Sequence, residues 1–277
     1  MRTRAWRSRV LTLALLVVLA PRPVDATEPL RLHAAGSLRE ALTEVAAAFT
    51  RASGIPVRTV FGASGLLRER LERGEPADVF ASADVENARR LVEAGKARDV
   101  VVFTRNRLCA IARPGLEVTP ESLLDRLLDP AVTVGTSTPG ADPAGDYAWQ
   151  MFARAEAARV GARATLEAKA RRLTGGSAPS GVPASGRGVY TDLIAAGAAD
   201  LMLTYCTNAA VVQRHLPDAR IVVPPPALAV AADYGVTALA GPRAADAAAL
   251  VAFLLSPEAQ AILQRHGFAS LSAAGRM

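Results

Sequence analysis

Short apolar runs alternate with longer amphipathic stretches through the first half of the chain. The apolar runs predict strands over Leu30–Ala35, Val57–Phe61, Val79–Ala81 and Val100–Phe103. The amphipathic stretches between them predict helices over Leu38–Ser53, Leu66–Arg73 and Val85–Ala94. A glycine follows each of these helices directly, as is common at helix C-termini. This alternation predicts a mostly parallel sheet with helices on both faces.

The second half of the chain continues the alternation, with one interruption. The predicted strands are Leu108–Ala112, Val132–Gly135, Leu201–Tyr205, Arg220–Val223 and Tyr234–Leu239. The predicted helices are Pro120–Leu128, Ala144–Val160, Ala162–Arg172, Val189–Ala196, Ala209–His215, Ala244–Leu255 and Pro257–His266. Residues 174–188 hold five glycines, two prolines and three serines, a composition that predicts a loop.

The length of 277 residues is compatible with one large domain or two smaller ones, and 51% hydrophobic residues exclude a disordered chain. Three consecutive prolines at 224–226 predict a stiff return of the chain near its end. We therefore expect an α/β fold of two lobes, each a mostly parallel sheet flanked by helices. Residues 27–106 plus 227–277 would form the first lobe, and residues 107–226 a second lobe inserted into it.

The first 26 residues differ from the rest in charge and hydropathy. They hold five arginines, one acidic residue, an apolar run at Val10–Ala20 and small residues at Val24 and Ala26. These features predict a secretory signal peptide over residues 1–26, cleaved after Ala26. The run is shorter than the about 20 apolar residues that cross a bilayer, which disfavours the alternative of a retained anchor. The signal peptide predicts a periplasmic protein. Without this segment the net charge falls from +6 to about +2, so we expect no nucleic-acid partner.

The two cysteines, Cys109 and Cys206, each lie in an apolar, strand-like stretch of a chain predicted to be exported. Disulfides persist outside the cytoplasm, so the two could form one bridge if their strands are neighbours. Cysteine is also a small core residue, and two buried free thiols are an equal alternative. The three histidines are scattered without the spacing of metal ligands, so we expect no metal and no cofactor.

Three strand-to-helix junctions, at residues 34–38, 61–66 and 136–145, are rich in small and hydroxyl-bearing residues. The first N–H groups of a helix have no partner within it, and together with the helix dipole they attract anions. Ordinary capping by serine or threonine explains any one junction alone. Ligands of such sheets bind beyond the carboxyl ends of the strands, so the three junctions together predict an oxyanion site.

Several segments together resemble the periplasmic molybdate-binding proteins of ABC transporters. These segments are Ala34–Leu38, Ser64 in its Gly-Ala-Ser turn, Pro76–Asp84, Asp142–Gly145 with Tyr147, Tyr205 at the end of a strand, Ser256–Gln260 and Gly267–Phe268. The resemblance covers nearly all of the chain after residue 26. The segment Pro76–Asp84 is its most specific part.

The resemblance implies a two-lobed periplasmic-binding-protein fold of type II. Such a protein closes as a monomer on a tetrahedral oxyanion, molybdate or tungstate, and delivers it to an ABC transporter permease in the inner membrane. By position, Ser37 and Ser64 would donate from the first lobe, and the Ala144 N–H and the Tyr205 phenol from the second. Neutral donors satisfy a dianion that has only acceptors, whereas hydrogen phosphate would lose about 1–3 kcal/mol by presenting a proton to a site without an acceptor.

The loop around Arg187 departs from that family's pattern. The family offers a further backbone donor just before the helix that leads to the Tyr205 strand, and here Gly186, Arg187 and Gly188 take that place. An inward Arg187 would pair with the oxyanion and change selectivity, but loop charges usually face solvent, which favours an outward side chain. Cys206 and Asn208 after Tyr205 also differ from the pattern.

Other classes of function fit the sequence less well. A hydrolase is disfavoured because no serine lies in a G-x-S-x-G turn and no histidine is placed beside a serine or cysteine, so we expect a protein that is not an enzyme. The carboxylates of Asp78 and Asp84 are interpreted as orienting loops. The sensor domain of a transcription regulator would share the lobes but not the signal peptide. Sulfate or thiosulfate binding stays the alternative within the binding class.

Overall fold

The computed structural model describes residues 28–176 and 184–269, so the predicted signal peptide lies outside the described residues. The described strands form one sheet in the order β2-β1-β3-β9-β4-β7-β5-β6, and β8 pairs with β4. Their bounds are β1 (Leu30–Ala35), β2 (Val57–Gly62), β3 (Val79–Ser82), β4 (Val101–Ala112), β5 (Val134–Ser137), β6 (Arg171–Thr174), β7 (Leu201–Tyr205), β8 (Arg220–Val222) and β9 (Ala231–Ala238).

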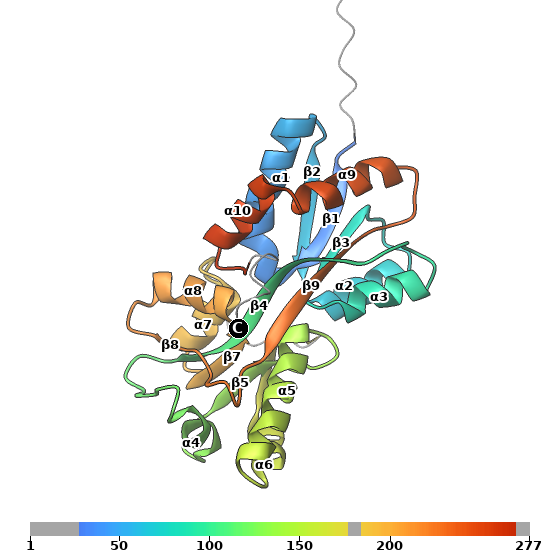
Figure 1. The fold of residues 1–277 in the computed structure, drawn as a ribbon. Coiled ribbons are helices and arrows are strands. Elements are labelled where there is room, and N and C mark those ends of the chain that lie inside the picture. Colours follow the sequence, from blue (N-terminus) through green and yellow to red (C-terminus); the bar gives the residue numbers. More distant parts are fainter. Residues whose placement is uncertain (1–27, 177–183, 270–277) are drawn as a thin grey trace, which may run out of the picture.

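Helices flank this sheet at both of its ends (Figure 1). At the β1–β3 end, here the first lobe, they are the short 3-10 helix η1 (Gly36–Leu38), α1 (Arg39–Ser53), α2 (Ser64–Glu72), α3 (Glu86–Glu93), α9 (Ala244–Leu254) and α10 (Pro257–Arg265). At the β5–β8 end, here the second lobe, they are α4 (Leu123–Leu128), α5 (Pro143–Ala158), α6 (Ala162–Lys169), α7 (Val189–Ala195) and α8 (Cys206–His215).

The direction of the strands divides the sheet into two parallel parts joined by two antiparallel strands. Strand β1 pairs in parallel with β2 and β3, and β5 pairs in parallel with β6 and β7. Between these parts, β9 runs antiparallel to β3 and β4, and β4 runs antiparallel to β7 and β8. The predicted two-lobed α/β fold is confirmed, with β4 and β9 passing between the lobes (Figure 1).

The structure corrects three predicted elements. The strands expected at Val100–Phe103 and Leu108–Ala112 are one strand, β4, because Arg105, Asn106 and Arg107 continue the pairing with β9. The helix expected to run from 162 to 172 ends at Lys169, and Arg171–Thr174 forms β6 beside β5. The predicted boundary between lobes after residue 106 therefore falls inside a strand, and the division of the chain stays a prediction.

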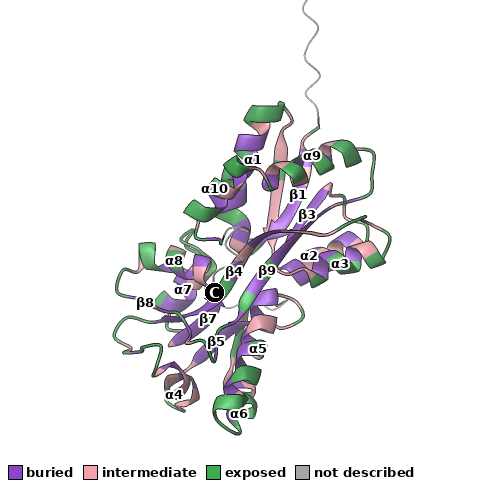
Figure 2. Ribbon diagram, in the orientation of Figure 1, coloured by how far each residue is buried: buried purple, intermediate pink, exposed green. Residues whose placement is uncertain are grey.

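Buried residues follow the sheet into both lobes (Figure 2). One cluster, which includes Leu32, Phe49 and Phe103, fills the first lobe. Another, which includes Leu123, Phe152 and Leu203, lies in the second lobe. Among the described residues, no single helix is long and apolar enough to span a membrane, and α9 with α10 reaches that length only as a pair bent by 60°.

Cys109 and Cys206 form a disulfide with their Cα atoms 4.9 Å apart. Cys109 lies in β4 opposite Thr204 of β7, and Cys206 is the first residue of α8. Neighbouring strands thus bring the two cysteines together, which decides between the alternatives that the sequence left open. The bridge ties the start of α8 to the strand that joins the lobes.

Candidate functional site

A cavity of about 870 Å³ lies between the lobes. Its wall includes four of the five predicted site residues: Ser37 and Ser64 from the first lobe, and Arg187 and Tyr205 from the second. The starts of η1, α2, α7 and α8 all contribute to it, because each of these helices begins just after a strand or loop that ends at the cavity. The junctions at 34–38 and 61–66 therefore meet there.

Ser64 is the first residue of α2 and is buried, with 1% of its surface exposed. Its Oγ accepts a hydrogen bond from the Ala83 N–H at 3.1 Å. That bond uses a lone pair of the oxygen, so the hydroxyl proton remains available for an acceptor in the cavity. The N–H groups of the first turn of α2 lack partners within the helix and add positive potential at the same place.

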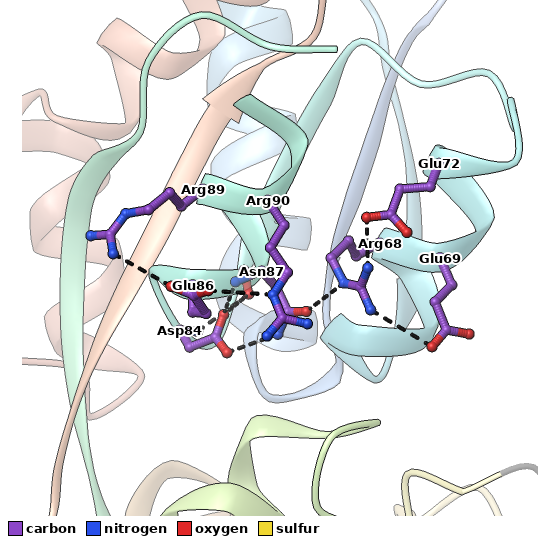
Figure 3. A network of polar contacts seen from close by, with 9 residues as sticks. Arg68, Glu69, Glu72, Asp84, Glu86, Asn87, Arg89 and Arg90 are labelled. Atoms are coloured by element: carbon purple, nitrogen blue, oxygen red, sulfur yellow. Dashed lines mark hydrogen bonds and ion pairs between the residues drawn. The ribbon is translucent and has the colours of Figure 1, made fainter. Parts of the chain in front are cut away.

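The turn that holds Ala83 is fixed by a polar network around Asp84 (Figure 3). Asp84 accepts hydrogen bonds from the backbone N–H of Asn87 at 2.9 Å and from its side-chain amide at 2.7 Å. The Arg68 Nε in turn donates to Asn87 Oδ1 at 2.9 Å. Asp78 is also structural, since it accepts the Arg31 N–H at 2.7 Å. The interpretation of both carboxylates as orienting loops is therefore consistent with their bonds.

Ser37 is oriented by a chain of hydrogen bonds that starts at Asn106 in β4. Asn106 Oδ1 accepts the Arg107 N–H, which fixes the amide so that its Nδ2 donates to the Tyr234 hydroxyl at 3.2 Å. Tyr234 and Ser37 share a hydrogen bond of 2.9 Å. With its oxygen accepting from Asn106, Tyr234 can donate its own proton to Ser37. The Ser37 hydroxyl then keeps its proton for the cavity.

Tyr205 ends β7 and is 2% exposed. Burial raises the pKa of its phenol well above 10, so the group is a neutral donor at every physiological pH. Its hydroxyl donates to the Ala83 carbonyl at 3.4 Å, and this bond joins the two lobes. Edge-to-face contacts with Tyr147 and Tyr234 hold the ring in place.

Ala144 differs from the other four predicted residues. It is buried in the first turn of α5 and is not among the residues that line the cavity. Its N–H donates to Oδ1 of Asp142, the residue that caps the helix, at 3.1 Å. Asp142 itself lines the cavity. In this structure a carboxylate thus occupies the backbone donor that the sequence assigned to the anion.

The carboxyl group of Asp142 has an unusual environment. Burial raises its pKa to about 6, and the negative charges of Asp146 and Asp84 act in the same direction. Hydrogen bonds from the Ala144 N–H and the Ser137 hydroxyl oppose the rise. Among the described residues, no arginine, lysine or histidine forms an ion pair with Asp142. The cavity therefore contains a carboxyl group that is half protonated near pH 6.

The surroundings of Asp142 are small or hydroxyl-bearing groups of the second lobe. Ser137 Oγ lies 2.6 Å from Thr174 Oγ1 and 3.3 Å from the Tyr190 hydroxyl. Gly175 packs so closely that a Cβ on it would lie 2.4 Å from the Cβ of Asp142, and its φ of 73° also favours glycine. The sequence singled out none of these residues as ligands, although residues 136–145 were recognised as a junction.

Arg187 lies on the wall of the cavity with 43% of its side chain exposed. Its Nε donates to Ser185 Oγ at 2.9 Å, and its Nη2 lies 3.7 Å from Asp192 Oδ1. The guanidinium is therefore engaged by its own loop and the start of α7. It is neither fully in solvent nor free within the cavity.

The two lobes touch at the edge of the cavity. The Gly65 N–H of α2 donates to the Ala141 carbonyl of the second lobe at 3.0 Å. Arg214 of α8 reaches both carboxylate oxygens of Glu40 in α1, at 2.7 and 2.8 Å. These contacts describe a closed arrangement. Within residues 28–176 and 184–269, no group of three or more histidine, cysteine, aspartate or glutamate residues is placed to hold a metal ion.

Comparison with known families gives the context of this geometry. The family model described as "Bacterial extracellular solute-binding protein" matches residues 30–269, which is most of the chain. The chain belongs to this family. Membership implies a periplasmic or secreted location and supports the expectation that this solute-binding protein is not an enzyme.

Individual proteins are similar to this chain in sequence or in fold. An uncharacterized protein of Pasteurella multocida is 35% identical over 187 residues, covering 67% of this solute-binding protein and 77% of the relative. The sulfate-binding protein SubI from Mycobacterium tuberculosis has a similar structure, with a TM-score of 0.74, 22% identity and coverage of 89% and 88%. The periplasmic molybdate-binding protein of Azotobacter vinelandii gives a TM-score of 0.68, 21% identity and coverage of 87% and 98%. At these identities the two structures support the fold alone.

Proposed function

We propose that this solute-binding protein captures a tetrahedral oxyanion between its lobes and delivers it to an ABC permease in the inner membrane. The observation that supports this most is that Ser37, Ser64 and Tyr205, from both lobes, line one cavity. The Ser37 and Ser64 hydroxyls can each donate a proton to an acceptor there, and Tyr205 can do so if its 3.4 Å bond to the Ala83 carbonyl breaks. A small anion that accepts from both lobes stabilises the closed state over an open one.

Molybdate or tungstate is the proposed cargo, because the motifs around Ser37, Ser64 and Pro76–Asp84 resemble those of molybdate-binding proteins. The solved structure of a sulfate-binding protein with a similar fold favours sulfate as a second candidate. We further propose that residues 1–26 direct the chain to the periplasm and that it acts there as a monomer. The Ala144 N–H can donate to the anion only if its hydrogen bond to the Asp142 carboxyl group breaks.

Calorimetry tests this proposal. The mature protein is titrated with molybdate, tungstate, sulfate and phosphate at pH 6, alongside Ser64→Ala and a matched control, Ser53→Ala, at the exposed end of α1. We expect at least one of these anions to bind to the wild type and to Ser53→Ala with the same affinity, and more weakly to Ser64→Ala. Failure of all four anions to bind would contradict the proposed function.

A further inference from the structure

We propose that Asp142 determines which tetrahedral anions this cavity accepts, because the hydrogen bond between its carboxyl group and the bound anion needs one proton. The inference rests on the proposed function and deepens it. An anion that brings its own proton, such as hydrogen phosphate, binds to ionised Asp142. A bare dianion, such as molybdate or sulfate, binds only after Asp142 itself has taken up a proton.

Asp142 and Ser64 lie on the two sides of one contact between the lobes. It lines the same cavity as Ser64, and its Oδ1 holds the Ala144 N–H at the start of α5. The preceding residue, Ala141, accepts the N–H of Gly65, the residue after Ser64. The contact between the lobes therefore lies one residue from each of the two side chains. An anion that accepts the Ser64 hydroxyl next to this contact would therefore lie close to the carboxyl group of Asp142.

The groups around Asp142 provide no positive charge to offset a second anion. Asp146 of α5 and Asp84 of the turn before α3 add negative charge. Tyr190 of α7 and Tyr205 of β7 are neutral phenols, and the charge of Asp142 helps to raise the pKa of both. Ser137 of β5 contributes a hydroxyl. An ionised carboxylate and a bare dianion both have only acceptors, so no hydrogen bond forms between them and their charges repel.

The basic residues that line the cavity are engaged elsewhere. Arg39 stacks on the Phe61 ring at 4.7 Å, and Arg187 lies near Asp192. His266 forms a hydrogen bond with Glu44 at 3.0 Å, and the charge of His215 contributes to lowering the pKa of Asp192. The sequence predicted a site of neutral donors that penalises hydrogen phosphate. Asp142 supplies the acceptor that such a site lacks, and so removes the expected penalty on hydrogen phosphate.

The test compares molybdate with phosphate at pH 6.5, 7.5 and 8.5 by calorimetry on the mature, full-length protein. Uptake of one proton by Asp142 predicts that molybdate affinity falls about tenfold per pH unit above the pKa, or about 100-fold over this range. Phosphate carries a proton throughout the range, so its affinity changes only a few-fold. Asp142→Asn keeps a capping oxygen for Ala144 but does not titrate. In this variant molybdate affinity becomes independent of pH, and the molybdate-to-phosphate ratio at pH 8.5 rises at least tenfold.

Asp125→Asn is the matched control, because Asp125 lies exposed on α4 of the same lobe and is not among the residues that line the cavity. We expect it to leave the ratio within a few-fold of the wild type. Tight molybdate binding that does not change with pH, or an equal shift in both variants, would overturn this inference alone. Loss of all anion binding in the wild type would overturn the proposed function as well.

Discussion

Two serines at the cavity each accept one hydrogen bond from the protein and keep a proton for the ligand. Ser64 accepts from the Ala83 N–H, and Ser37 shares its bond with Tyr234. Removing either hydroxyl leaves an acceptor of the bound anion without a partner. We predict that Ser37→Ala and Ser64→Ala each weaken anion binding by about 1–3 kcal/mol, as measured by calorimetry. Wild-type affinity in the double variant would contradict these roles.

The raised pKa of Asp142 predicts how stability without ligand depends on pH. The pKa of its carboxyl group is about 6 in the folded protein and 3.8 when exposed. The folded protein therefore loses stability as the pH rises from about 4 to about 6, and this loss remains at higher pH. Asp142→Asn removes this cost. We take the free energy of unfolding of the variant minus that of the wild type. We predict that this difference is larger at pH 8 than at pH 4, by up to about 3 kcal/mol.

Chemical denaturation of both proteins at the two pH values measures this difference. Comparing the variant with the wild type at each pH cancels the opposite contributions of Glu75 and Asp200, whose pKa values are lowered to about 2 by their hydrogen bonds. An unchanged difference between variant and wild type at pH 4 and pH 8 would show that Asp142 is not destabilised when ionised.

The sequence predicted part of the site at this scale. Ser37 and Ser64 lie in strand-to-helix junctions that are visible in the sequence, Tyr205 was assigned through the resemblance to molybdate-binding proteins, and all three line the cavity. The role of Asp142 was not predicted. An aspartate before a proline indicates a helix cap, but whether its carboxyl group also faces a cavity depends on how Gly175 and Ser137 pack around it.

Elements with a clear apolar core were predicted well from the sequence. The bounds of β1 and β7 agree with the prediction, since all but one of their residues are buried. The break predicted inside β4 arose from Arg105, Asn106 and Arg107. Arg105 pairs with Asp233 of β9, and Asn106 bonds to Thr207 and Tyr234. These polar residues belong to the strand because partners distant in sequence satisfy them.

Gly65 at the start of α2 packs tightly against the second lobe, because a Cβ on it would lie 2.5 Å from the Gly140 carbonyl oxygen. A substitution here therefore tests whether the lobes must close. We predict that Gly65→Ala weakens anion binding at least tenfold, because the methyl group keeps the lobes apart. Melting without ligand should not fall much, since alanine is the better helix former. In the control Gly241→Ala, the added methyl group meets nothing within 4 Å, and binding should be unchanged. Equal affinity in both variants would argue against closure at this contact.

The disulfide between β4 and α8 tests how the second lobe is held. It closes a loop of 97 residues, and loss of such a bridge costs about 2–5 kcal/mol. We predict this loss of free energy of unfolding for the double variant Cys109→Ser, Cys206→Ser, measured by denaturation. A reducing agent should destabilise the wild type similarly and leave the variant unaffected. Equal stability of oxidised wild type and variant would show that the bridge contributes little.

At the scale of the whole molecule, the alternation of strands and helices was enough to predict two α/β lobes. The sequence did not show that β4 and β9 are shared between the lobes, because pairing between β3 and β9 or between β4 and β7 joins distant segments. Contacts such as Arg214 with Glu40 appear only once these segments are assembled. The cavity forms where the assembled lobes meet, and Ser37 and Ser64 at the ends of strands supply donors in its wall.

A tetrahedral oxyanion bound between the lobes at Ser37, Ser64 and Tyr205 can be located by diffraction at the molybdenum absorption edge, from crystals of the mature protein grown with molybdate at pH 6. We expect one strong anomalous peak in the cavity, within hydrogen-bond distance of hydroxyl groups from both lobes. A peak on one lobe alone, or outside the cavity, would contradict this expectation.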